Sequence, residues 1–239
     1  MLDPASIQAL TFDVFGTVVD WRGSIARDFG AFFAARSPRI ERDWANFADA
    51  WRGKYQPAME RVRSGGRGFV KLDALHRENL EEALNEFAVS GLSETELDHV
   101  NRVWHRLDPW PDSVTGMTRL KRRYVLASLS NGNVSLIVAM AKRAGIPWDA
   151  VLGAETARAY KPQPEAYFRA AEMLSLAPAQ CLMVAAHNAD LHAAAKTGFR
   201  TAFIRRPLEI PGKTHDLAAD SGIDLDCRDM NDLADKLGC

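Results

Sequence analysis

Residues 8–20 constrain the fold of this chain more than any other stretch. A largely apolar run at residues 9–12 ends abruptly in Asp13, and Gly16 then lets the chain turn. Aspartate is a poor strand former and is costly to bury, so its place at the end of such a run requires an explanation. The explanation is that this run is a buried parallel strand, which carries one charged side chain to the edge of a sheet. We therefore interpret Asp13 as a covalent nucleophile.

The composition is that of a globular protein with little net charge. Of 239 residues, 47% are hydrophobic, and the formal net charge is −1. This excludes disorder and predicts no affinity for nucleic acid or an anionic membrane. Cys181, Cys227 and Cys239 are an odd, widely spaced set, which argues against a disulfide scaffold or a zinc site. No uncharged apolar stretch approaches the roughly 18 residues of a membrane span, so we expect a cytoplasmic protein.

Residues 24–107 carry a helical pattern. Aromatic and aliphatic side chains recur there at helical spacing, for example at Phe29 and Phe33. Residues 93–96 have the pattern of a capping box, and it predicts a helix whose apolar stripe runs to Leu107. We expect four or five helices and no strand in this segment, which follows the first strand as an insert.

The remainder of the chain alternates between strand and helix patterns. We expect strands at residues 124–129, 150–153, 181–186, 201–204 and 223–227. Such alternation predicts a parallel sheet with helices on both faces. The predicted fold is therefore α/β, with a three-layer core formed by residues 1–20 and 108–239 and a helical cap formed by residues 21–107. Residues 205–207 are expected to form an exposed loop.

The unusual polar residues all fall where such a fold binds its ligand, beyond the carboxyl ends of the strands. An ionised aspartate nucleophile needs a nearby cation, and Lys161 suits this task. Ser130 and the backbone N–H groups after it suit a substrate anion. Asp190 suits the orientation or deprotonation of a water molecule. The residues expected at this edge are Asp13, Thr17, Ser130, Asn131, Lys161, His187 and Asp190.

Four segments, in this order along the chain, resemble the motifs of the haloacid dehalogenase superfamily. They are Phe12-Asp13-Val14-Phe15-Gly16-Thr17, Leu129-Ser130-Asn131-Gly132, Tyr160-Lys161-Pro162 and Ala185-Ala186-His187-Asn188-Ala189-Asp190. One such motif alone is weak evidence, but four in order make a specific match. The resemblance implies a Rossmann-like core with an inserted helical cap, and chemistry through an aspartyl intermediate.

Phe15 separates two reactions within this superfamily. Its phosphatases carry a second aspartate at this position, which protonates the leaving alkoxide and helps to hold Mg²⁺. Phe15 can do neither, and Asp190 has no acidic neighbour in the fourth motif, so oxygen ligands for a dication are few. A halide leaves without a proton, and Phe15 adds an apolar wall suited to a carbon-centred substrate. The chain thus resembles the L-2-haloacid dehalogenases, which require no metal or organic cofactor.

The resemblance also assigns the binding residues. Arg52, within residues 51–54, matches the arginine that receives the departing halide, and Asn131 matches the asparagine that lines the halide site. Ser130 matches the serine that binds the substrate carboxylate. Phe69 is expected to line the pocket. The motifs specify neither the halogen nor the preferred acid.

The residues around the nucleophile are assigned in the same way. Lys161 matches the lysine paired with the nucleophile, Thr17 the threonine beside it, and Tyr167 a tyrosine of the same site. The implied mechanism is an in-line attack of Asp13 on C2 of a short 2-haloalkanoic acid, with inversion and halide loss. Water then hydrolyses the aspartyl ester and releases a 2-hydroxy acid.

Two positions depart from the family pattern. His187 stands where much of the family has asparagine, and Ala189 stands where it has tryptophan. Both change the pocket, and His187 is expected either to assist the hydrolytic water or to be a bystander. A Mg²⁺-dependent phosphatase of small phosphomonoesters and a non-catalytic protein that binds a small anion remain alternatives. The resemblance further implies a homodimer.

Overall fold

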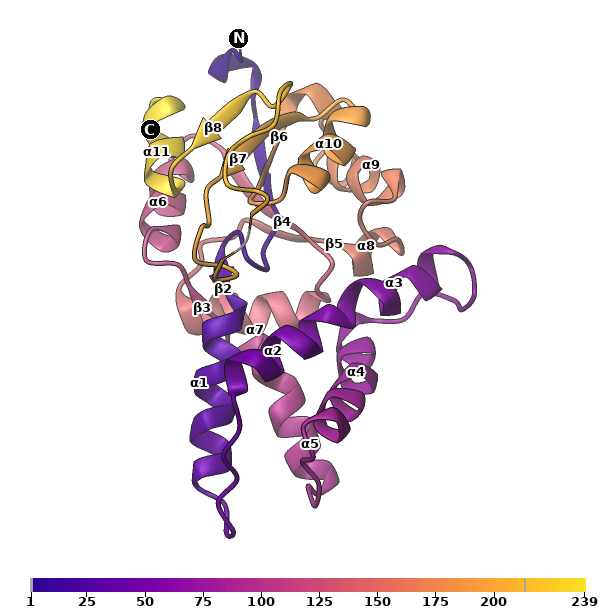
Figure 1. Ribbon diagram of the computed structural model, residues 1–239. Coiled ribbons are helices and arrows are strands. Elements are labelled where there is room, and N and C mark those ends of the chain that lie inside the picture. The colour runs from indigo at the N-terminus through magenta and orange to yellow at the C-terminus, as the bar shows by residue number, and fades with distance from the viewer. Residues whose placement is uncertain (1, 213) are drawn as a thin grey trace.

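The computed structural model describes residues 2–212 and 214–239 and contains a parallel sheet with a group of helices on one edge (Figure 1). In the described residues the sheet has six strands in the order β5-β4-β1-β6-β7-β8, and every pairing is parallel. The predicted fold class is therefore confirmed. The strands are β1 (Ala9–Phe12), β4 (Val125–Ser130), β5 (Ala150–Gly153), β6 (Cys181–Ala185), β7 (Arg200–Ile204) and β8 (Leu225–Cys227).

Strand β1 lies in the middle of this sheet, paired with β4 on one side and β6 on the other. All four of its residues are fully buried. Leu10 and Phe12 face one hydrophobic cluster and Ala9 faces the other, as the two-residue period of a strand dictates. Burial on both faces explains why β1 is a short continuous apolar run, and it places Asp13 at the carboxyl end of the central strand.

Helices cover both faces of the sheet. The cluster around Leu10 includes residues of α6 (Ser113–Leu120), α7 (Val134–Ala144) and α11 (Met230–Lys236). The cluster around Ala9 includes residues of α9 (Pro164–Met173) and α10 (Asn188–Lys196), and the short α8 (Ala154–Ala157) precedes α9. Figure 1 shows α6 and α11 on one side of the sheet and α9 and α10 on the other. This arrangement confirms the predicted three-layer core.

Residues 21–107, all of which are described, contain five α-helices and a 3₁₀ turn. They are α1 (Trp21–Ala34), α2 (Trp44–Gly53), α3 (Tyr55–Arg63), α4 (Leu72–Glu86), α5 (Glu94–Asn101) and η2 (Arg102–His105). The capping box of Ser93 and Glu96 is present. The predicted continuous helix to Leu107 is wrong. Helix α5 ends at Asn101, and the chain continues as the tighter 3₁₀ turn η2, which contains the buried Val103 and Trp104.

A short antiparallel ribbon joins these helices to the sheet. Strand β2 (Val19–Asp20) pairs with β3 (Asp108–Pro109), so the chain leaves the core and returns to it side by side. The predicted domain boundaries at residues 20 and 108 fall in this ribbon. None of the helices in residues 2–212 and 214–239 combines the length and the hydropathy needed to cross a bilayer.

Candidate active site

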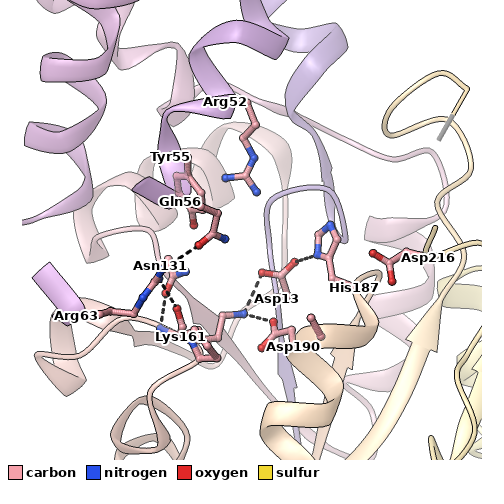
Figure 2. A pocket seen from close by; sticks show the side chains of 12 residues that line it. Asp13, Arg52, Tyr55, Gln56, Arg63, Asn131, Lys161, His187, Asp190 and Asp216 are labelled. Atoms are coloured by element: carbon pink, nitrogen blue, oxygen red, sulfur yellow. Dashed lines mark hydrogen bonds and ion pairs between the residues drawn. The ribbon is translucent and has the colours of Figure 1, made fainter. Parts of the chain in front are cut away.

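A cavity of about 470 Å³ lies over the carboxyl end of β1, between the sheet and the cap helices (Figure 2). Three segments that are far apart in the sequence meet there, because β1, β4 and β6 are neighbours in a parallel sheet. The cap contributes four side chains from α2 and α3. The lining residues are Asp13, Arg52, Tyr55, Gln56, Arg63, Asn131, Lys161, Pro162, His187, Ala189, Asp190 and Asp216.

Asp13 is 8% exposed, and hydrogen-bond donors and a cation contact both of its oxygens. The Lys161 Nζ lies 3.0 Å from Oδ1, and the Thr17 hydroxyl donates to Oδ2 at 2.7 Å. Thr17 is itself fixed, since its oxygen accepts the Ala186 N–H at 2.9 Å. Burial raises the pKa of Asp13, but Lys161 and His187 more than offset burial and hold the pKa well below its ordinary value. The nucleophile is therefore ionised over the whole useful pH range.

Lys161 joins two carboxylates. Its ammonium contacts Asp13 and also forms a short ion pair with Asp190. The Tyr167 hydroxyl donates to the other oxygen of Asp190 at 2.6 Å. Burial lowers the pKa of Lys161, whereas Asp13 and Asp190 raise it above its ordinary value, and the net shift is upward. The structure thus brings together four of the predicted residues, with Asp190 as the fixed counter-charge of the lysine.

His187 approaches Asp13 from the opposite side. Its Nδ1 lies 3.3 Å from Asp13 Oδ2, and its Nε2 lies 3.0 Å from Glu209 Oε1. Glu209 is 3% exposed and accepts the indole N–H of Trp21 at 3.1 Å. Burial lowers the pKa of His187, but hydrogen bonds to Asp13 and Glu209 raise it to about 10. At neutral pH His187 is therefore a cation beside the nucleophile.

Arg52 extends from α2 into the cavity toward Asp13, as Figure 2 shows. Its guanidinium carbon lies 3.8 Å from the centroid of the Tyr55 ring and 5.6 Å from that of Trp21. Its Nη1 is buried and has no hydrogen-bond partner within the described chain. A buried donor without an acceptor is costly, and a small anion would satisfy it.

The motif after β4 presents its two polar residues differently. Asn131 lines the cavity and its Oδ1 accepts the backbone N–H of Lys161 at 2.8 Å, which ties two motifs together. Ser130 is 0% exposed and its hydroxyl accepts the Gly132 N–H at 3.0 Å. Ser130 thus shapes the turn and lies behind the cavity wall.

Two predicted pocket residues are not among the lining residues. Phe15 is buried, and its ring packs edge-on against Trp104, Tyr55 and His76, so the expected apolar wall is instead a support for the cap. Phe69 stacks on the ring of Tyr160 with the centroids 5.3 Å apart. There it is half-buried and is not among the residues that line the cavity.

Five residues at or beside the site escape the sequence reasoning. Tyr55, Gln56, Arg63 and Asp216 line the cavity, and Glu209 holds His187. Gln56 and Arg63 lie on an amphipathic helix, where polar residues are usually at the surface. Glu209 and Asp216 lie in the loop after β7, which has no periodic pattern. The glycine at position 16 is the one sequence feature connected with Glu209. A Cβ at this position would lie 2.0 Å from Glu209 Oε1, so the close approach of Glu209 requires a glycine there.

The superfamily's Mg²⁺ does not fit these residues. A dication at this site would need several oxygen ligands around the nucleophile. Here the ammonium of Lys161 occupies the position between Asp13 and Asp190, and Phe15 supplies no carboxylate. Within residues 2–212 and 214–239 no three His, Cys, Asp or Glu side chains are grouped as a metal site requires. We therefore derive no step through a metal.

An ionised, buried aspartate at the end of the central strand of a parallel sheet, with helices inserted above it, is typical of α/β hydrolases that work through an aspartyl intermediate. A family model described as haloacid dehalogenase-like hydrolase matches residues 7–198. The chain belongs to this family.

Individual relatives agree with this assignment. The (S)-2-haloacid dehalogenase of Xanthobacter autotrophicus is 28% identical over 205 residues, which cover 84% of this chain and 76% of that protein. The structure of a defluorinating L-2-haloacid dehalogenase is 50% identical, with a TM-score of 0.94 over 98% of this chain and 96% of that one. A second L-2-haloacid dehalogenase is 45% identical, with a TM-score of 0.92 over 97% and 99% of the two chains.

Proposed function

We propose that this protein hydrolyses a short 2-haloalkanoic acid to a 2-hydroxy acid and releases the halide. One observation carries the proposal: in one cavity an ionised Asp13 faces the guanidinium of Arg52, which has a buried donor without an acceptor (Figure 2). A nucleophile and an anion acceptor on opposite sides of a substrate carbon are the requirements of an in-line displacement. The relatives named above carry out dehalogenation, which supports the same reaction.

The first step needs no acid. A carboxylate oxygen of Asp13 attacks C2, and the carbon–halogen bond breaks with its electron pair going to the halide. The halide moves toward Arg52 and Asn131, whose N–H groups stabilise the charge that develops on it. Thr17 and Lys161 keep the attacking carboxylate in one orientation. The product of this step is an ester of Asp13, with inversion at C2.

The second step uses His187. In the ester Asp13 no longer carries a charge, so His187 loses one of the two anions that raise its pKa, and it gives up the Nδ1 proton. The neutral imidazole then accepts a proton from the water that attacks the Asp13 carbonyl carbon. The same proton passes to the departing 2-hydroxy acid. The Asp13 carboxyl left by hydrolysis then gives its proton to Nδ1 of His187, which replaces the one first lost to solvent and restores the starting state. Glu209 remains as the anion that stabilises the imidazolium formed in between.

A phosphatase is the weaker alternative. Phosphate esters leave as strongly basic alkoxides, and that reaction needs an acid near the leaving group. Phe15 occupies the position at which the superfamily's phosphatases have this acid, and its ring is buried against Trp104. A non-catalytic anion-binding role does not explain why Lys161 and His187 both contact the carboxylate of Asp13 and keep it ionised.

Three further statements remain predictions from the sequence and from the resemblance. We propose that residues 21–107 act as a cap on a core of residues 1–20 and 108–239, that two copies form a homodimer, and that the protein works in the cytoplasm.

Halide release tests the function directly. Wild type and Asp13→Asn are assayed with 2-chloropropionate and fluoroacetate, each with and without EDTA. We expect wild-type halide release that EDTA does not change, and a loss of about 10⁴-fold or more in the variant, as for other covalent nucleophiles. EDTA-sensitive phosphate release from small phosphomonoesters would select the phosphatase. Neither activity, together with stabilisation by a small anion, would leave only binding.

A further inference from the structure

We propose that Arg63, on cap helix α3, binds the carboxylate of the substrate and that Gln56 holds it in position. The inference rests on the proposed function and adds to it a residue outside the four motifs. Figure 2 shows Arg63 and Gln56 side by side on the cavity wall formed by the cap, next to Asn131 and Lys161.

Three contacts fix the Arg63 guanidinium. Its Nη1 donates to the carbonyl oxygen of Lys161 at 3.1 Å, and its Nη2 donates to Gln56 Oε1 at 3.3 Å. Its Nε donates to Glu60 Oε2 at 2.8 Å. The Arg63 side chain is only 12% exposed, whereas that of Glu60 is 61% exposed, so solvent screens the Glu60 charge. Of five guanidinium N–H groups, two remain for a ligand.

The other cations of the cavity already have partners or roles. Lys161 is bound by Asp13 and Asp190, and His187 by Asp13 and Glu209. Arg52 lies over the Tyr55 ring, where it suits the halide. A 2-haloacid carries its carboxylate on the carbon next to the one attacked, so a second anion site is required close to the first. Arg63 is also ion-paired, but its partner Glu60 is 61% exposed, and among the described lining cations Arg63 is therefore the one best able to bind a second anion.

Ser130, the expected carboxylate ligand, is in a less suitable place. Its side chain is 0% exposed, and its hydroxyl oxygen accepts the Gly132 N–H. Arg63 lines the cavity directly, and the planar fork of a guanidinium matches the two oxygens of a carboxylate.

The position of Arg63 also links recognition to the cap. Arg63 belongs to α3, while the carbonyl it contacts belongs to Lys161 of the core. A carboxylate bound by Arg63 is therefore held by a residue of α3 that is itself hydrogen-bonded to the core. An acid substrate is held between cap and core, and a neutral analogue with the same carbon–halogen bond is not.

The test compares Arg63→Met with Arg61→Met, a matched variant at an exposed arginine of the same helix that does not line the cavity. Halide release is measured with 2-chloropropionate and with its neutral amide. We expect Arg63→Met to raise KM for the acid by about 10- to 100-fold, the effect of losing a hydrogen bond to a charged group. The preference for acid over amide should fall by the same factor, and Arg63→Lys should restore part of it. Arg61→Met should behave as wild type.

A binding measurement separates this inference from the reaction itself. Propionate has the carboxylate but no halogen, and it should raise the Tm of wild type and Arg61→Met but not of Arg63→Met. No halide release with this pattern retained would overturn the proposed function and keep the carboxylate site. Equal Tm shifts in all three proteins, or equal losses on acid and amide in Arg63→Met, would overturn the role of Arg63.

Discussion

The two sides of Asp13 are built alike, and they differ in one chemical respect. On one side, Lys161 is paired with Asp190, which accepts a hydrogen bond from the Tyr167 hydroxyl. On the other side, His187 is paired with Glu209, which accepts one from the Trp21 indole. Each side is a cation, its counter-anion and an aromatic donor that orients the anion.

The difference lies in what each cation does when the charge of Asp13 disappears. The pKa of Lys161 starts at 10.5 and is raised further, so its ammonium persists when the ester forms. The ordinary pKa of histidine is 6.5, and the raised value of about 10 depends on Asp13 and Glu209 together. The Lys161 side is therefore a permanent charge that prepares the nucleophile. The His187 side can release and accept a proton between the two steps.

Among variants that test the two sides of Asp13, removal of Lys161 should lower halide release most. In Lys161→Met, Asp13 and Asp190 would be two buried carboxylates without a shared cation, and the pKa of Asp13 would rise. Breaking a buried ion pair costs about 3–5 kcal/mol, and a loss of this size in transition-state stabilisation would lower halide release by roughly 100- to 5,000-fold. The assay is steady-state halide release at pH 7. Lys142→Met, at an exposed position of α7, is the control, and an equal loss in both variants would remove the special role of Lys161.

The two sides also differ in how far the sequence predicts them. The residues of the Lys161 side are all assigned by the family resemblance: Lys161 and Asp190 lie in the motifs, and Tyr167 lies close beyond Lys161 on α9. His187 is likewise found by its place after β6. Its partner Glu209 is not, since the loop after β7 has no repeating pattern from which contacts follow. The inner strands β1, β4, β6 and β7 are predicted within one residue, because they are largely apolar runs buried on both faces.

The same loop shows why the prediction for residues 205–207 fails. Residues 205–207 were expected to be exposed, yet Arg206 is buried. Its guanidinium donates to both oxygens of Asp112 and to the carbonyl of Thr17. Those partners lie 94 and 189 positions away in the sequence. A charged residue is buried when a distant partner compensates for its desolvation, and a local pattern contains no information about such a partner.

Matched variants of the two counter-anions should separate the two chemical steps. Glu209→Gln removes the anion that stabilises the His187 imidazolium, so we expect ester hydrolysis to slow by about 100-fold, the lower end of the 10²- to 10⁴-fold contribution of general base catalysis. The aspartyl ester should then accumulate and appear as added mass on the quenched protein. Asp190→Asn disturbs the Lys161 side, so the first step should slow and no ester should accumulate. Accumulation in both variants, or in neither, would contradict the division of labour.

The pH dependence of stability should show the sharpest contrast between the two sides. The pKa of His187 is raised from 6.5 to about 10 in the folded state. Its contribution to stability is therefore fully present below pH 6.5 and is lost as the pH rises toward 10, at up to about 1.4 kcal/mol per pH unit. The contribution of Lys161 begins to fall only above its ordinary value of 10.5.

Urea unfolding of wild type and His187→Asn at several pH values between 6 and 10 measures this contrast. The stability advantage of wild type should be largest near pH 6 and should shrink steadily toward pH 10, because groups other than His187 titrate in both proteins and cancel in the difference. Lys161→Met, compared with wild type in the same way, should show a difference that does not depend on pH over this range. Parallel curves for wild type and His187→Asn would mean that Glu209 does not hold a charged imidazolium beside Asp13, and His187 would then be no more than a neutral neighbour of the nucleophile.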